Sequence, residues 1–154
     1  MAEPLDELYR DIIMDHYRYP RGRKDIPDAD IRNEGQNPVC GDEISVALKF
    51  ANDTVEDISV ECAGCAISVA SGSMLADIIK GKTISEVKII ANTIRAILKG
   101  EEPPSNLELG DLAALAGVKN FPVRVKCALL SWTTLIDAID AAEKGQAIKV
   151  SSTE

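Results

Sequence analysis

The residues of this chain best suited to chemistry are its four cysteines, Cys40, Cys62, Cys65 and Cys127. A deprotonated thiol can attack an electrophilic sulfur, and it is also a ligand for zinc and for iron. The sequence holds a single histidine, His16, so these functions would fall mainly to the thiols. The question is which cysteines the fold brings together.

Cys40 lies in the stretch NPVCGD, where two features restrict or free the backbone. Pro38 stiffens the approach, and Gly41 puts no side chain between Cys40 and Asp42, so both could turn toward one ion. An aspartate oxygen is a harder and more easily displaced ligand than a thiolate, which suits exchange better than permanent structural binding. On spacing alone, buried or unconnected thiols are the alternative to a metal site.

The composition limits the class of partner. With 154 residues and 45% hydrophobic residues, the chain fits one domain with a real core. The formal net charge of −8 argues against nucleic acid or an anionic membrane as partner, since phosphates select for clustered cations. The chain has no run of about 20 apolar residues, and MAEPLDELYR does not resemble a signal peptide. We therefore expect a cytoplasmic protein with reduced thiols.

The hydrophobic pattern predicts an α+β fold, in which an antiparallel hairpin is combined with several helices. We expect helices from Leu5 to His16, over 66–80, over 83–98 after a Thr-x-x-Glu capping box, within 107–117, and from Pro122 onward; strands at 44–50 and 58–62; and irregular chain at 17–39, at 101–106 and after Gly145.

This pattern places the cysteines. Cys62 shares the core-facing phase of its strand with Ile58 and Val60. Cys65 comes at the start of a helix, where the helix dipole stabilises a thiolate. Cys127 lies off the apolar stripe of the last helix. Cys40, Cys65 and Cys127 thus come from separate parts of the chain, as in a tertiary metal site that Asp42 could complete.

Three stretches, NPVCGD, GCAISVASGSML and FPVRVKCALLSW, resemble the cysteine motifs of the IscU/SufU/NifU N-terminal family of iron–sulfur cluster assembly proteins. LYRDIIMDHYRYPRG is similar to the N-terminus of that family. The resemblance runs in order through nearly the whole chain. It implies a SufE/NifU-like α+β fold, with a small antiparallel sheet packed against several helices, and residues 1–154 as a single U-type assembly domain.

The resemblance also implies a site and partners. Cys40, Asp42, Cys65 and Cys127 match the metal ligands of the family, which hold either zinc or a nascent [2Fe-2S] cluster. Cys40 matches the acceptor of persulfide sulfur from a PLP-dependent cysteine desulfurase. The other partners implied are recipient apo iron–sulfur proteins or downstream carriers. At most, the activity would be that of a sulfurtransferase working with the desulfurase.

Two departures point to the SufU-like branch. The IscU branch has a histidine before its third cysteine, where this chain has Lys126, and the preceding chaperone-recognition motif is not matched. LELGDLAALAGVKNFP resembles the insertion that marks the SufU branch. Arg124, one helical turn before Cys127, is expected to pair with Asp42 or a thiolate and tune the site. Lys126 is an auxiliary candidate only.

The same residues also allow simpler interpretations. A structural zinc-binding adaptor would use the same ligands without sulfur transfer, and a Cys62–Cys65 redox pair would need the two thiols to face one another. Cys62 is expected to be a core thiol, and His16 to pack or form a local hydrogen bond. Acidic residues around Glu61 are expected to be solvated surface.

Overall fold

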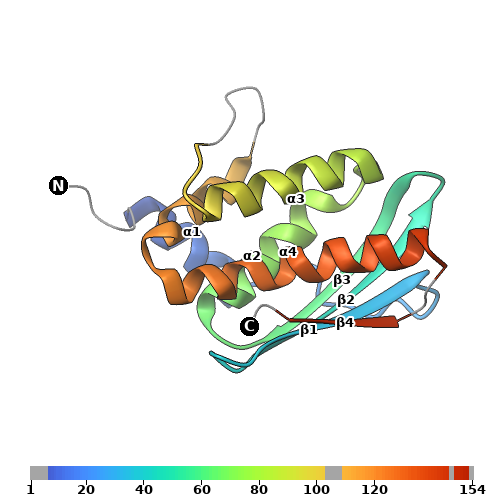
Figure 1. The fold of residues 1–154 in the computed structure, drawn as a ribbon, viewed down its shortest axis with the longest axis horizontal. Helices are drawn as coiled ribbons and strands as arrows, with labels where there is room; N and C mark the ends of the chain where they lie inside the picture. The colour runs from blue at the N-terminus through green and yellow to red at the C-terminus, as the bar shows by residue number, and fades with distance from the viewer. Residues whose placement is uncertain (1–6, 103–108, 146–147, 153–154) are drawn as a thin grey trace.

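A four-stranded β-sheet is the platform on which the helices pack (Figure 1). The structure is a computed structural model that describes residues 7–102, 109–145 and 148–152. The elements are α1 (Glu7–Arg18), β1 (Ile31–Asn37), β2 (Asp42–Ala51), β3 (Thr54–Ala63), α2 (Ala66–Ile79), α3 (Ile84–Leu98), the 3₁₀ helix η1 (Gly110–Asn120), α4 (Pro122–Glu143) and β4 (Ile148–Ser152). The helix start expected at Leu5 and part of the linker expected at 101–106 lie outside the described residues.

The strand order is β3-β2-β1-β4. β2 is antiparallel to both β1 and β3, whereas β4 pairs in parallel with β1 at the edge of the sheet. The predicted α+β class and the β2–β3 hairpin are confirmed. The hairpin turns at Asn52, whose φ of 58° is the left-handed conformation that asparagine tolerates in turns.

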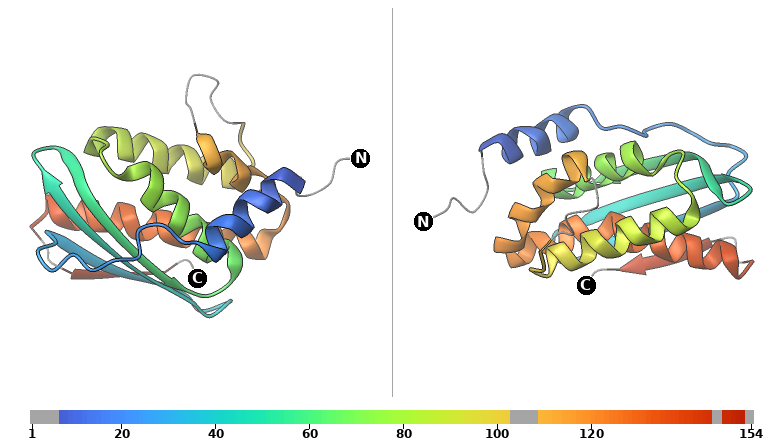
Figure 2. Two further views of the ribbon diagram at one scale, coloured as in Figure 1. Left: turned by 180° about the vertical axis from the view of Figure 1, so that it is seen from behind. Right: turned by 90° about the horizontal axis from the view of Figure 1, so that it is seen from above.

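The helices lie on one side of the sheet in layers (Figures 1 and 2). α2 and α4 pack directly against the strands and against each other. α3 packs on α4 and η1, and α1 packs on α2 and η1. Among the described residues, no helix covers the other face of the sheet, where alternate strand residues are exposed.

The core between the sheet and these helices includes Trp132 of α4, which is fully buried. Its indole N–H donates to Ser71 Oγ of α2 at 3.1 Å, so the largest core side chain leaves no unpaired donor. Within the described ranges, no helix combines the length and apolar character that crossing a membrane requires.

The prediction of an irregular segment over residues 17–39 is wrong for its C-terminal part, because residues 31–37 form β1. The inward positions of β1 after Ile31 are Asn33, Gly35 and Asn37, so apolar alternation is absent. The Asn33 side chain donates to Thr134 O of α4 at 3.0 Å, and a Cβ on Gly35 would lie 2.1 Å from Thr134 Oγ1. Close helix packing and a buried amide stabilise this strand in place of large side chains.

Three further expectations need correction. The chain after Gly145 is not wholly irregular, since residues 148–152 form β4. The helix expected to stop at Gly117 is the 3₁₀ helix η1, which continues to Asn120. α4 is buried on more than one stripe because it contacts both the sheet and the other helices, and Cys127 and Ser131 are therefore buried as well.

Candidate metal centre

Three chain segments meet at one end of the sheet, the left end in Figure 1. They are the β1–β2 turn, the β3–α2 connection and the first turns of α4. Cys40 Sγ, a carboxylate oxygen of Asp42 and Cys127 Sγ all lie within 4.8 Å of one another. The two sulfurs are 3.3 Å apart. Ligands of one tetrahedral zinc ion are roughly 4 Å apart, so this donor set fits such an ion.

The β1–β2 turn presents Cys40 at the surface. The backbone N–H groups of Cys40 and Gly41 both donate to Asn37 O, at 3.2 and 2.9 Å. Gly41 has a φ of 74°, a conformation that residues with a side chain rarely adopt. Cys40 is half-buried, and Val39 beside it is 58% exposed. The proline and glycine of NPVCGD therefore form a tight turn that leaves this sulfur accessible.

Asp42 is the buried carboxylate of the site, only 1% exposed. Its Oδ1 accepts from the backbone N–H of Cys65 at 2.9 Å, and its Oδ2 accepts from Asn37 Nδ2 at 3.2 Å. A Cβ on Gly64 would lie 2.2 Å from Asp42 Oδ1. Two donors offset the cost of burying the carboxylate, and glycine at 64 makes room for it.

Cys65 is the N-cap of α2, as the sequence predicts. Its sulfur accepts from Ser68 N at 3.4 Å, as an N-cap side chain does. Cys65 is linked to the carboxylate through its own N–H, but its sulfur is not among the three groups that meet within 4.8 Å. The structure brings three of the four predicted ligands into direct proximity and places Cys65 alongside them.

Cys127 forms the floor of the site. Its side chain is fully buried in α4, and burial raises the pKa of its thiol strongly, with further contributions from Cys40, Asp42 and Cys65. A cluster that disfavours additional negative charge is one that a divalent cation would stabilise, since the cation offsets the repulsion between anionic donors.

Arg124 projects back over the sulfurs from the first turn of α4. Its Nη1 lies 3.9 Å from both Cys40 Sγ and Cys127 Sγ, and the pKa of the guanidinium is raised, chiefly by Cys127. Of the two partners predicted for Arg124, Asp42 or a cysteine sulfur, the structure shows contacts with the sulfurs. Lys126 is exposed, and among the described residues no hydrogen bond or ion pair links it to the cysteines or Asp42.

Cys62 belongs to the core side of β3. It is half-buried against the hydrophobic core, its Sγ lies 3.3 Å from Ser68 Oγ, and burial raises the pKa of its thiol. It is not one of the three clustered groups. This position supports the prediction of a structural thiol.

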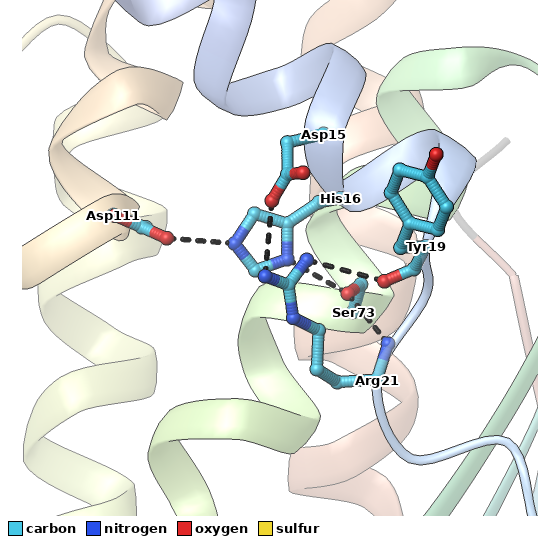
Figure 3. A network of polar contacts seen from close by, with 6 residues as sticks. All are labelled: Asp15, His16, Tyr19, Arg21, Ser73 and Asp111. Atoms are coloured by element: carbon cyan, nitrogen blue, oxygen red, sulfur yellow. Dashed lines mark hydrogen bonds and ion pairs between the residues drawn. The ribbon is translucent and has the colours of Figure 1, made fainter.

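His16 is a buried, hydrogen-bonded core residue, as expected, but its hydrogen bonds are long-range rather than local (Figure 3). Its Nδ1 lies 2.7 Å from Ser73 Oγ and its Nε2 lies 2.8 Å from Asp111 Oδ2. Ser73 Oγ also accepts from the backbone N–H of Arg21 at 2.8 Å. Because the hydroxyl is buried and already bonded, the Ser–His–Asp contacts join α1, α2 and η1 rather than activate a nucleophile.

Sequence reasoning missed Asn37, which is fully buried and contacts both Asp42 and Cys127. The sequence did offer a signal for Asn37, because it is the first residue of NPVCGD. In the structure it pairs with Asp42 across the hairpin. Gly64 was also missed, although a glycine directly before a candidate ligand is a common mark of close packing.

In this α+β domain, thiols and a buried carboxylate meet at one end of the sheet. These are the groups that a protein uses to bind a metal ion or to transfer sulfur. The sequence pattern of the NifU-like N terminal domain matches residues 8–128. The chain belongs to this family.

Three comparisons show which individual proteins the chain is similar to. It is 43% identical over 141 residues to the zinc-dependent sulfurtransferase SufU of Bacillus subtilis, covering 92% of this chain and 95% of that protein. It is 40% identical over 144 residues to the iron–sulfur cluster assembly scaffold protein IscU of Streptococcus pyogenes, covering 92% and 89%. The crystal structure of a nitrogen-fixing NifU-like protein (N-terminal) from Brucella abortus superimposes with a TM-score of 0.83 at 22% identity, covering 92% and 99%, and supports the fold.

Proposed function

We propose that this chain is a cytoplasmic iron–sulfur cluster assembly protein that accepts persulfide sulfur from a PLP-dependent cysteine desulfurase. In this proposal residues 1–154 form one U-type assembly domain. The similarity to SufU and IscU supports the process, and the arrangement of the sulfurs supports the role of individual residues.

The observation that carries the proposal is the asymmetry of the site. Cys127 and Asp42 are buried, whereas Cys40 is half-buried on a turn whose neighbour Val39 is 58% exposed. A closed structural zinc site would have no need of a partly accessible thiol on a turn. A partly accessible thiol on a turn beside the buried Asp42 and Cys127 is suited to reaching a partner while these two residues stay in place.

The resident metal in this proposal is zinc, held by Cys40, Asp42, Cys65 and Cys127. When bound, zinc would keep the thiols deprotonated at neutral pH. Cys65 is included in the set because its N–H donates to Asp42 Oδ1 at 2.9 Å, which places this residue beside the three clustered groups.

In the transfer step, the thiolate of Cys40 attacks the outer sulfur of the desulfurase persulfide. The S–S bond of that persulfide breaks, its electron pair leaves with the desulfurase cysteine as a thiolate, and Cys40 becomes a persulfide. No external oxidant or reductant is consumed. The guanidinium of Arg124, near both sulfurs, stabilises negative charge on the acceptor.

A scaffold for a nascent [2Fe-2S] cluster is the second candidate, because the similarity to a scaffold IscU at 40% identity favours it. It uses the same cysteines, with Asp42 as an oxygen ligand that eases cluster release to recipient apo proteins or downstream carriers. A brown anaerobic protein with visible absorption would favour scaffolding, and a colourless zinc protein would favour sulfur relay.

The test is to mix the purified chain with its cysteine desulfurase and cysteine and to measure alanine formation. We expect the wild type to raise the rate and to gain one sulfur atom on Cys40 by mass spectrometry. The Cys40→Ala variant should lose both effects. The Cys62→Ala variant is the matched control and should keep them, because Cys62 is not one of the three groups that meet at the site. A wild type that neither raises the rate nor accepts a cluster refutes the proposal.

A further inference from the structure

Asn37 is connected to three of the four candidate ligands, through two different parts of the residue. Its backbone carbonyl accepts from the N–H groups of Cys40 and Gly41 and so shapes the turn. Its side chain points the other way, where Nδ2 lies 3.2 Å from Asp42 Oδ2 and 3.6 Å from Cys127 Sγ. A carboxamide nitrogen carries two hydrogens, one for each acceptor.

The orientation of the Asn37 amide is set by the site. Its Oδ1 is buried without a hydrogen-bond partner among the described residues, an uncommon state for a buried amide. The reversed orientation would put this oxygen against the Asp42 carboxylate and the Cys127 sulfur. Asn37 therefore leaves its own acceptor unpaired while both donors face the ligands.

The two halves of the site are thus held differently. The buried pair, Asp42 and Cys127, receives hydrogen bonds from the Asn37 side chain, and Asp42 receives another from Cys65. Among the described residues, the Asn37 side chain forms no hydrogen bond with the sulfur of Cys40, and Asn37 binds Cys40 through the backbone of the turn.

We infer that Asn37 is a positioning residue that fixes Asp42 and Cys127 as metal ligands and leaves Cys40 as the ligand free to depart. This inference rests on the proposed function, in which Cys40 leaves the ligand set to accept sulfur. Partners that orient a metal ligand from outside typically change metal affinity by about 10- to 100-fold when they are removed.

The test compares Asn37→Ala with Asn33→Ala in the full chain loaded with zinc. Asn33 is the matched control, because it is a fully buried asparagine on the same face of β1 whose amide binds Thr134 rather than a ligand. Zinc affinity is measured by competition with a chromophoric chelator. We expect Asn37→Ala to bind zinc about 10- to 100-fold more weakly, and Asn33→Ala to bind it as the wild type does.

A second variant separates positioning from folding. Asn37→Leu keeps most of the volume and removes both donors together with the unpaired oxygen, so the metal-free protein should stay folded by circular dichroism. Its zinc affinity should still fall, and the visible spectrum of the cobalt-substituted protein should change because the ligands are no longer held. The inference fails if Asn37→Leu and Asn37→Ala bind zinc and cobalt like the wild type.

The two proposals can fail separately. If the wild type raises the desulfurase rate and both Asn37 variants retain normal zinc affinity, the positioning role is wrong and the proposed function stands. If the wild type gives no rate increase and accepts no cluster, the proposed function is wrong, whatever zinc affinity the Asn37 variants show.

Discussion

Gly64 offers the sharpest test of how the site is built, because a single methyl group there would displace the buried carboxylate. In Gly64→Ala the new Cβ would lie 2.2 Å from Asp42 Oδ1, 2.9 Å from its Cγ and 3.0 Å from its Cα. Real carbon contacts at the first two distances are essentially absent from proteins. Since Asp42 Cα belongs to β2, rotating the side chain alone relieves only part of the clash.

The expected cost follows from this geometry. Overpacking of a close-packed site costs about 1–3 kcal/mol, and loss of the Cys65 N–H···Oδ1 bond at 2.9 Å adds to it. We expect the free energy of unfolding to fall by about 2 kcal/mol. Because Asp42 leaves its position beside Cys40 and Cys127, zinc content should fall as well.

The assay is urea unfolding of the metal-free protein, followed by circular dichroism, with zinc content measured by elemental analysis after loading. Gly81→Ala is the control. Gly81 has a φ of 87° and open space around its Cβ position, so alanine there meets backbone strain of about 1–2 kcal/mol without touching the site. A Gly64→Ala protein with wild-type zinc content and unfolding free energy would refute the close-packed description of Asp42.

Three other changes have distinct expected outcomes. Arg124→Ala should slow sulfur acceptance by Cys40 several-fold in the alanine assay because the cation near both sulfurs is lost, while Lys126→Ala should match the wild type. Thr83→Ala should lower the unfolding free energy by about 1 kcal/mol through loss of the α3 capping box, with zinc content unchanged. His16→Ala should lower it by about 2–4 kcal/mol, since a buried ring and two hydrogen bonds are lost; an unchanged urea midpoint would contradict its bridging role.

The features predicted correctly from sequence are those with local signals. The Thr-x-x-Glu box before α3, Pro122 at the start of α4 and the helix start at Cys65 are all present, because caps and first turns depend on neighbouring residues. The tight turn around Cys40 follows equally from its own proline and glycine.

The features that were missed depend on distant packing. β1 buries Asn33 and Gly35 against α4, and no period of apolar residues records this. Cys127 is buried because α4 packs against both the sheet and the other helices, although it lies off the stripe that the helix pattern predicts. The contacts of Asn37 likewise join residues up to 90 positions apart, which local reasoning does not reach.

The candidate ligands come from three distant segments of the chain, so the site forms only when the chain folds. In an unfolded chain the three thiols are separated by long loops, so a metal ion has no preformed set to bind. The hydrophobic core extends through the sheet and the helices far beyond the sulfurs, so the fold has a source of stability that a zinc finger lacks. Metal binding then stabilises an already folded molecule by mass action, and the gain grows with free metal concentration. Under the proposed function, loss of the ion would therefore not require the chain to unfold.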